Sequence, residues 1–107
     1  MQNKSVRIVF TEQAFDELMA YEFELEIRST GLGAKFQEDF SEVTFLLVDF
    51  PNAGRILGKY NVHRMNLRRF PYHVIYRLED ENVVIYAVSH HQRPPDFWHS
   101  RFGTDEE

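Results

Sequence analysis

The sequence contains no cysteine among its 107 residues, which excludes disulfide bonds, thiolate metal sites and cysteine nucleophiles. It also has no apolar run close to the roughly twenty residues that cross a bilayer, so we expect no membrane span. We expect no signal peptide either, because the apolar run that begins at Val6 is short and charged residues follow it. These absences together favour a cytoplasmic protein that does not bind membranes.

Positive charge is in short supply: 12 Lys and Arg residues stand against 17 Asp and Glu residues, for a net charge of −5. This balance weighs against broad electrostatic binding to nucleic acid. The charges are uneven, however, because residues 12–49 hold most of the acids and the C-terminal half is basic. We therefore expect a local cationic patch on an acidic body. The basic residues of that half are Arg55, Lys59, Arg64, Arg68, Arg69, Arg77, Arg93 and Arg101.

The chain is long enough for one domain with one core. Hydrophobic residues make up 43% of it and aromatic residues 15%, which argues against disorder. We expect residues 1–107 to form a single domain, with a core from about 6 to 101 and a mobile tail at 103–107.

The clearest structural signal lies in residues 68–95. Two runs rich in Val, Ile and Tyr flank the acidic turn 79–82, which is the sequence form of a β-hairpin. If Asp80–Glu81 forms the tip, Tyr72 faces Ser89 across the hairpin.

Alternation of side chains along the strands divides this hairpin into two predicted faces. The first is apolar and is expected to face the core: Tyr72, Val74, Tyr76, Leu78, Val83, Ile85 and Ala87. The second mixes apolar residues with titratable or cationic ones: His73, Ile75, Arg77, Val84, Tyr86, Val88 and His90. We expect the functional residues on this mixed face.

Two amphipathic helices are predicted before the hairpin. Thr11 is a candidate N-cap for the first, which runs to about Ser29, and the glycines in 31–33 separate it from the second. The apolar stripe of the first helix is Ala14, Phe15, Leu18, Tyr21 and Leu25, and that of the second is Phe36, Phe40, Val43, Leu47 and Phe50. Such a pair predicts an antiparallel helical hairpin with its stripe facing a sheet.

Strands are expected over Val6–Phe10 and Val62–Leu67, and a loop from Pro51 through Gly58. The order β-α-α-β-β-β predicts an α+β domain in which the helical hairpin packs on one side of a mainly antiparallel β-sheet. The other side of the sheet is expected to stay partly open. Phe97 and Trp98 are expected to hold the tail against the core.

Several short motifs follow one another along most of the chain: Gly31-Leu32-Gly33; Phe50-Pro51-Asn52-Ala53-Gly54-Arg55; Arg68-Arg69-Phe70-Pro71-Tyr72; Tyr76-Arg77; and Ala87-Val88-Ser89-His90 with Arg93, Pro94 and Trp98. Taken together, over about residues 6 to 101, they resemble the RelE/ParE family of type II toxin-antitoxin toxins. The resemblance implies a RelE/ParE-like fold and a small bacterial toxin encoded beside an antitoxin that wraps and neutralises it, often as part of a plasmid stabilisation system.

The resemblance implies two rival mechanisms, because ParE-type members poison DNA gyrase whereas RelE-type members cleave messenger RNA on the ribosome. Neither implies a cofactor. We expect no metal site, since His90 and His91 are adjacent strand residues that point to opposite faces and no carboxylate or cysteine spacing completes a site.

Cleavage of RNA by its own 2′-hydroxyl needs a base, an acid and cations for the developing phosphorane charge. By the resemblance, Arg93 matches an arginine that supplies part of this in the RelE branch. His73 falls where that branch has another arginine, and Phe97 and Trp98 occupy the region of its C-terminal tyrosine. His73 and His90, expected on one face, are a candidate acid/base pair. The competing interpretation, which we favour, is that both are ordinary polar residues on a half-exposed sheet.

Four further residues are candidates for binding a target or a phosphate. Arg68 and Arg69 suit a phosphate or an acidic surface, or else one extends along apolar surface while the other pairs with an acid. Arg77 beside Tyr86 suits a cationic and aromatic contact surface, or else is a surface charge at the end of a strand.

The first hypothesis is a ParE-like toxin that binds a protein target such as DNA gyrase, without chemistry of its own. The second is a RelE-like, ribosome-dependent mRNA endonuclease that uses Arg93, His73 and His90. The third is a degenerate toxin retained as an antitoxin-binding module, which the acidic pI motivates. In each case we expect an antitoxin partner that contributes an amphipathic helix or an added strand. The sequence leaves the oligomeric state open.

Overall fold

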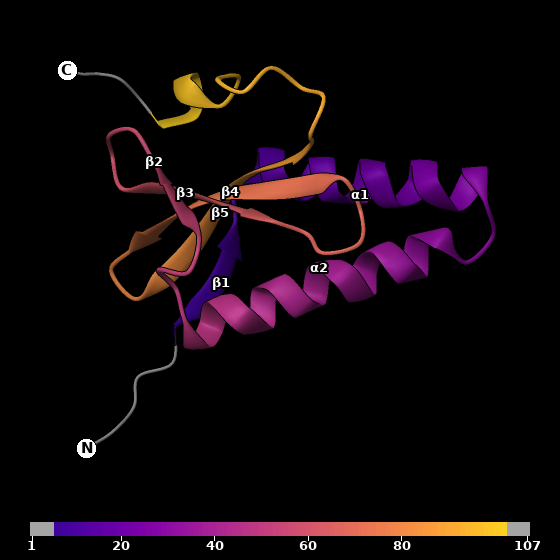
Figure 1. The fold of residues 1–107 in the computed structure, drawn as a ribbon, viewed down its shortest axis with the longest axis horizontal. Coiled ribbons are helices and arrows are strands. Elements are labelled where there is room, and N and C mark those ends of the chain that lie inside the picture. The colour runs from indigo at the N-terminus through magenta and orange to yellow at the C-terminus, as the bar shows by residue number, and fades with distance from the viewer. Residues whose placement is uncertain (1–5, 103–107) are drawn as a thin grey trace.

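The computed structural model describes residues 6–102, and the tail predicted to be mobile lies outside the described residues. Its elements are β1 (Arg7–Phe10), α1 (Glu12–Arg28), α2 (Leu32–Asp49), β2 (Arg55–Leu57), β3 (Val62–Asn66), β4 (Tyr72–Glu79), β5 (Asn82–His90) and the short 3-10 helix η1 (His99–Phe102). The five strands form one sheet in the order β1-β5-β4-β3-β2. Only β1 runs parallel to its neighbour, so the predicted α+β fold with a mainly antiparallel sheet is confirmed (Figure 1).

Local sequence explains the helical hairpin. The Thr11 hydroxyl caps α1 by accepting a hydrogen bond from the Ala14 N–H, as predicted. Gly31, the N-cap residue of α2, has φ +90°, a left-handed conformation that side chains disfavour. The Glu26 carboxylate accepts hydrogen bonds from the N–H groups of Gly31 and Gly33 at the start of α2, and these bonds lower the pKa of Glu26. A Cβ at Gly33 would lie 3.1 Å from the Glu22 carbonyl oxygen, so the glycine also lets the helices approach closely.

The main core lies between the helical hairpin and one face of the sheet. Most of the predicted stripe is buried there: Ala14, Leu18, Leu25, Phe36, Phe40, Val43 and Leu47. Two predictions were wrong, because Phe15 is 49% exposed and Phe50 is 62% exposed. Phe15 lies on the outer side of α1 and contacts Phe10 edge to face, and Phe50 is the C-cap residue, beyond the last turn of α2.

A β-bulge divides the hairpin into two registers. Near the tip, Tyr76 pairs with Ile85 as the sequence predicts, whereas Ile75 pairs with Ala87, so Tyr86 is the extra residue. Beyond the bulge, the residues of β5 exchange faces: Val88 joins the main core and Ala87 joins the opposite face. The predicted placement of Ala87, Val88 and His90 was therefore wrong, and Tyr72 pairs with His90 rather than Ser89.

The predicted loop after α2 contains the edge strand β2. The buried Tyr76 hydroxyl holds its start, because it accepts from the Gly54 N–H at 2.9 Å and donates to the Pro51 carbonyl at 2.9 Å. A Cβ at Gly54 would lie 2.7 Å from that hydroxyl oxygen. This contact gives a physical reason for glycine after Pro51-Asn52-Ala53.

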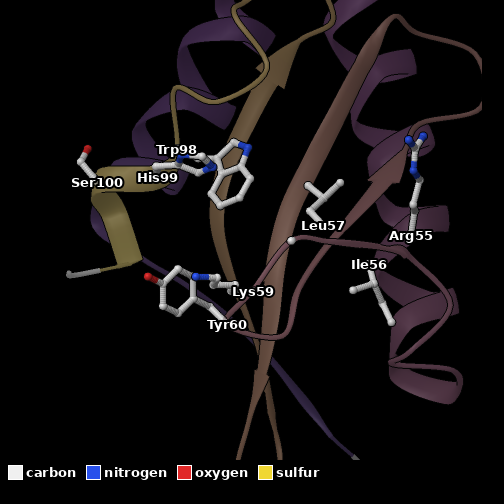
Figure 2. Close-up of a pocket in the computed structure, with 9 residues that line it drawn as sticks. Arg55, Ile56, Leu57, Lys59, Tyr60, Trp98, His99 and Ser100 are labelled. Carbon is white, nitrogen blue, oxygen red and sulfur yellow. The ribbon is translucent and has the colours of Figure 1, made fainter. Parts of the chain in front are cut away.

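The second face of the sheet is partly open, as predicted, but the chain's own C-terminal segment covers the rest of it. The segment that follows β5 returns across it and ends in η1 (Figure 1). Trp98, only 6% exposed, packs there with Val62, Ile75 and Ala87. Leu57 of β2 borders the same cluster and lies across from the Trp98 ring (Figure 2). The expectation that Trp98 and Phe97 hold the tail to the core is confirmed.

Candidate functional site

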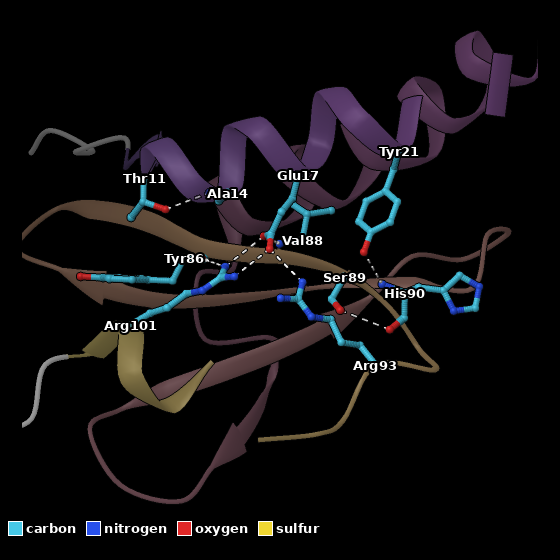
Figure 3. A network of polar contacts seen from close by, with 10 residues as sticks. All are labelled: Thr11, Ala14, Glu17, Tyr21, Tyr86, Val88, Ser89, His90, Arg93 and Arg101. Atoms are coloured by element: carbon cyan, nitrogen blue, oxygen red, sulfur yellow. Dashed lines mark hydrogen bonds and ion pairs between the residues drawn. The ribbon is translucent and has the colours of Figure 1, made fainter. Parts of the chain in front are cut away.

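A carboxylate from α1, Glu17, is the centre of a polar network beside β5 (Figure 3). Its side chain is 16% exposed and accepts hydrogen bonds from the Val88 N–H at 3.0 Å and the Arg93 guanidinium at 2.9 Å. Arg101 of η1 adds two more, from Nη1 at 3.0 Å and Nη2 at 2.8 Å. One acid thus joins the first helix, the fifth strand and the C-terminal segment.

This network satisfies backbone groups beside the bulge. Arg101 Nη1 also donates to the Tyr86 carbonyl oxygen at 2.9 Å, while Glu17 takes the Val88 N–H. Buried backbone groups without partners would be costly, so Glu17 and Arg101 stabilise the register that the bulge imposes. Burial alone would raise the pKa of Glu17, but the hydrogen bonds from Arg101, Val88 and Arg93 outweigh it and lower that pKa.

Arg93, the candidate catalytic arginine, is held on two sides. One nitrogen pairs with Glu17, and the guanidinium carbon lies 3.9 Å from the centre of the Phe97 ring. The side chain is 36% exposed. Its charge is therefore met within the chain and is only in part available to a phosphate.

The two candidate catalytic histidines do not meet. His90 lies on the helix-covered face, where its ring contacts Tyr72 at 5.0 Å between centroids and its backbone N–H donates to the Tyr21 hydroxyl. His73 lies near His91 instead, with 3.0 Å between their Nδ1 atoms. The expected shared face was wrong because the bulge turns His90 over.

Burial, and to a smaller extent the positive charges of Arg64, His91 and His90, lower the pKa of His73 to about 4. Burial also lowers the pKa of His91. With a pKa well below 7, the buried His73 imidazole is neutral at pH 7. A hydrogen bond then joins the two Nδ1 atoms of His73 and His91, one of them donating and the other accepting. A base with so low a pKa takes up protons weakly at that pH.

Arg77 and Tyr86 lie together, as predicted. The Arg77 guanidinium carbon is 5.4 Å from the Tyr86 ring centre and 5.0 Å from that of Phe102. Glu79 pairs with Arg77 at 2.8 Å and accepts a short hydrogen bond from the Tyr86 hydroxyl. The Arg77 side chain remains 26% exposed, so a cation framed by two rings reaches the surface.

Arg68 and Arg69 form a separate group at the other end of β4. Both guanidinium groups lie 3.4 Å from Glu42, and both side chains are more than half exposed. Beneath them, the fully buried Asp39 accepts hydrogen bonds from the N–H groups of Arg68, Arg69 and Phe70, at 3.2, 2.8 and 2.9 Å. Asp39 of α2 therefore fixes the turn that leads into the hairpin.

The ParE toxin family matches this architecture. The family model described as the ParE toxin of the type II toxin-antitoxin system, parDE, covers residues 8–95. The chain belongs to this family. No curated protein matches the sequence.

Solved structures share the fold of this ParE-family chain. A chain of the chromosomal ParDE system from P. aeruginosa superposes with a TM-score of 0.66 at 20% identity, over 80% of this chain and 96% of that one. The intact E. coli RelBE complex gives 0.63 at 20% identity, over 83% and 100% of the two chains. The RelBE2 complex from Mycobacterium tuberculosis gives 0.58 at 24% identity, over 81% and 99%. Both branches are represented, so the fold does not choose between their mechanisms.

Sequence reasoning missed Glu17, Asp39 and His91 as organising residues of this ParE-family fold, and treated Arg101 only as part of the basic half. Each acts on backbone or side chains far away in the sequence, as in the hydrogen bond from Val88 to Glu17. A usable signal was Asp39, an acid directly before Phe40 on the buried side of an apolar helix.

Over residues 6–102, no group of three or more His, Cys, Asp or Glu side chains is placed to hold a metal ion. In the same range no helix is long and apolar enough to cross a bilayer.

Proposed function

We propose that this chain is a cytoplasmic ParE-type toxin that stops growth by binding a protein target, DNA gyrase being the first candidate, and that an antitoxin neutralises it. The observation that carries the proposal is the separation of the candidate RNase residues. His73 and His90 lie on opposite faces of the sheet, and Arg93 is engaged by Glu17 and Phe97. Binding a protein needs a contact surface and none of this machinery.

The surface that we assign to the target is the cluster of Arg77, Tyr86 and Phe102. Arginine and tyrosine are the residue types that contribute most to protein interfaces, and here a partly exposed guanidinium is held between two rings. Because Glu79 and the rings fix its position, little side-chain freedom is lost on binding. Arg68 and Arg69 are more exposed and less constrained, which gives them the smaller role.

The surface that we assign to the antitoxin is the outer side of α1. Four apolar side chains follow one another there at intervals of one turn and are 41–69% exposed: Phe15, Met19, Phe23 and Ile27. A stripe of this kind fits the apolar face of an amphipathic helix. Acidic residues flank it, including Glu22 and Glu26, so the partner helix should carry basic residues at its margins.

Messenger RNA cleavage is the second candidate, and one observation favours it. The buried His73 imidazole is held by His91, an arrangement that fixes a tautomer and orients a ring nitrogen. Its low pKa makes it a weak base, and Arg93 would have to leave Glu17 to reach a phosphate.

The deciding experiment is expression of the chain without its antitoxin, followed by parallel measurement of DNA replication, translation and transcript integrity. We expect replication to stop while transcripts stay intact, and purified protein to inhibit gyrase supercoiling. Cleaved transcripts with unaffected gyrase would identify the RNase instead. Unimpeded growth would identify a degenerate, antitoxin-binding module.

Paired variants test the two surfaces. Arg77→Ala should abolish gyrase inhibition, whereas Arg68→Ala, at a more exposed arginine in the turn before β4, should weaken it far less. Phe23→Asp should weaken antitoxin binding, whereas Phe45→Asp on α2, at a similarly exposed phenylalanine, should not. Equal behaviour within either pair contradicts that assignment.

A further inference from the structure

A cleft of about 860 Å³ lies between the β2–β3 loop and η1. Leu57, Lys59 and Tyr60 line it from the strand side, and Trp98, His99 and Ser100 line it from the C-terminal segment (Figure 2). Its volume falls within the range of about 300–1,000 Å³ that small-ligand sites occupy. Neither proposed surface uses it.

The loop that carries the aromatic residue Tyr60 into the lining of the cleft has a strained backbone. Tyr60 is 57% exposed and has φ +66°, and the next residue, Asn61, has φ +59°. A tyrosine in the left-handed region is strained, and strain of this kind concentrates at binding sites. The loop thus presents an uncovered ring beside the cleft, while the buried Trp98 forms its floor.

The charge of the cleft is positive although the chain is acidic overall. Its lining includes Arg55, Lys59 and His99 and no carboxylate. Among residues 6–102, neither the Lys59 ammonium nor the Arg55 guanidinium forms an ion pair, whereas Arg68, Arg69, Arg77, Arg93 and Arg101 all do. The cleft therefore offers a ligand two cations, Arg55 and Lys59, whose charge no acid of residues 6–102 pairs with.

We propose that this cleft binds a nucleotide, with the base against the Tyr60 ring and the phosphate on the Lys59 ammonium. Bases stack on exposed aromatic rings whatever their sequence, and a lysine binds phosphate as a point charge. Arg55 adds positive potential at the strand side of the cleft. A free mononucleotide and a nucleotide within a single strand offer the same base and phosphate, so both are possible sources.

Binding at this site can be followed by the fluorescence of Trp98, because Trp98 is the only tryptophan in the chain and lines the cleft. Titration of the full-length protein with AMP should change its emission saturably, with the same dissociation constant by calorimetry. Lys59→Ala and Tyr60→Gly should each weaken binding about tenfold. Glycine accepts the left-handed conformation at position 60, so the second variant keeps the loop. Lys35→Ala, an exposed lysine of α2, should bind like the parent.

Binding of three further ligands, compared with that of AMP, shows what the cleft recognises. Tighter binding of a short single-stranded oligonucleotide than of AMP would support the site and assign it to a strand. Equal binding of inorganic phosphate or of a polyglutamate peptide would overturn the proposal, since the cleft would then recognise charge alone. No saturable signal with any nucleotide at millimolar concentration, or a signal that neither variant changes, would overturn it as well.

Discussion

The two faces of the sheet are closed in different ways. On one face, two long helices bury a continuous apolar cluster, whose members Phe36, Leu47 and Val74 are fully buried. On the other, a short segment places Trp98 over three residues and is held by ion pairs to Glu17. The first face depends on apolar area, which salt and pH barely change, and the second depends on charges. We expect the target to bind at the second face, because displacing the short C-terminal segment costs less than displacing the two helices.

The largest effect should come from the helix-covered face. Phe36→Ala removes a fully buried ring that contacts Phe40, Phe70 and Tyr72, and should lower the free energy of unfolding by about 3–5 kcal/mol. Denaturant titration measures it. A loss below about 1 kcal/mol would mean that this face is not the main core.

The next effect is a pH dependence that belongs to the second face. The pKa of His73 is 6.5 in an unfolded chain and about 4 in the fold. Between these two pH values the unfolded chain binds more protons than the folded chain. The stability that neutral His73 contributes is therefore fully present above pH 6.5 and is lost as the pH drops toward 4, by up to about 3 kcal/mol.

Denaturant titrations across this pH range should show the loss in the parent and a flatter profile in His73→Asn. The exposed His99→Gln is the control and should keep the parental profile. If His73→Asn and the parent have the same profile, His73 is not the group responsible.

Removing the charge of Glu17 should have a somewhat smaller effect. Glu17→Gln leaves Arg101, which is 12% exposed, without its carboxylate, and should cost about 2–3 kcal/mol. Glu42→Gln, at a 42% exposed acid that also faces two arginines, should cost less than about 1 kcal/mol. Because the pKa of Glu17 is lowered from 4.5, its contribution is complete above that pH and is lost as the pH falls through the folded value. Equal costs for the two variants would contradict the central role of Glu17.

The smallest effect concerns the edge of the sheet. Tyr76→Phe removes the hydroxyl that joins Gly54 and Pro51, and should cost about 1–2 kcal/mol. Gly54→Ala should be worse alone, since its Cβ meets that hydroxyl, and the double variant should recover part of the loss. Strictly additive losses would show that the two residues do not interact.

The helix-covered face could be predicted because its signals are local. The Thr11 cap, the left-handed Gly31 and the stripe from Phe36 to Leu47 all follow from neighbouring residues. The second face could not, because one extra residue at Tyr86 reverses which β5 side chains share a face. The groups that stabilise this bulge, Glu17 and Arg101, are distant in the chain, so alternation alone paired His73 with the wrong histidine.

The most direct test of the central claim is the accessibility of Trp98, the single tryptophan, to a neutral quencher such as acrylamide. If the C-terminal segment closes the second face through Glu17, quenching should be weak in the parent and strong in Glu17→Gln, with the helical circular dichroism unchanged. Quenching of the parent as efficient as that of free tryptophan would contradict the account.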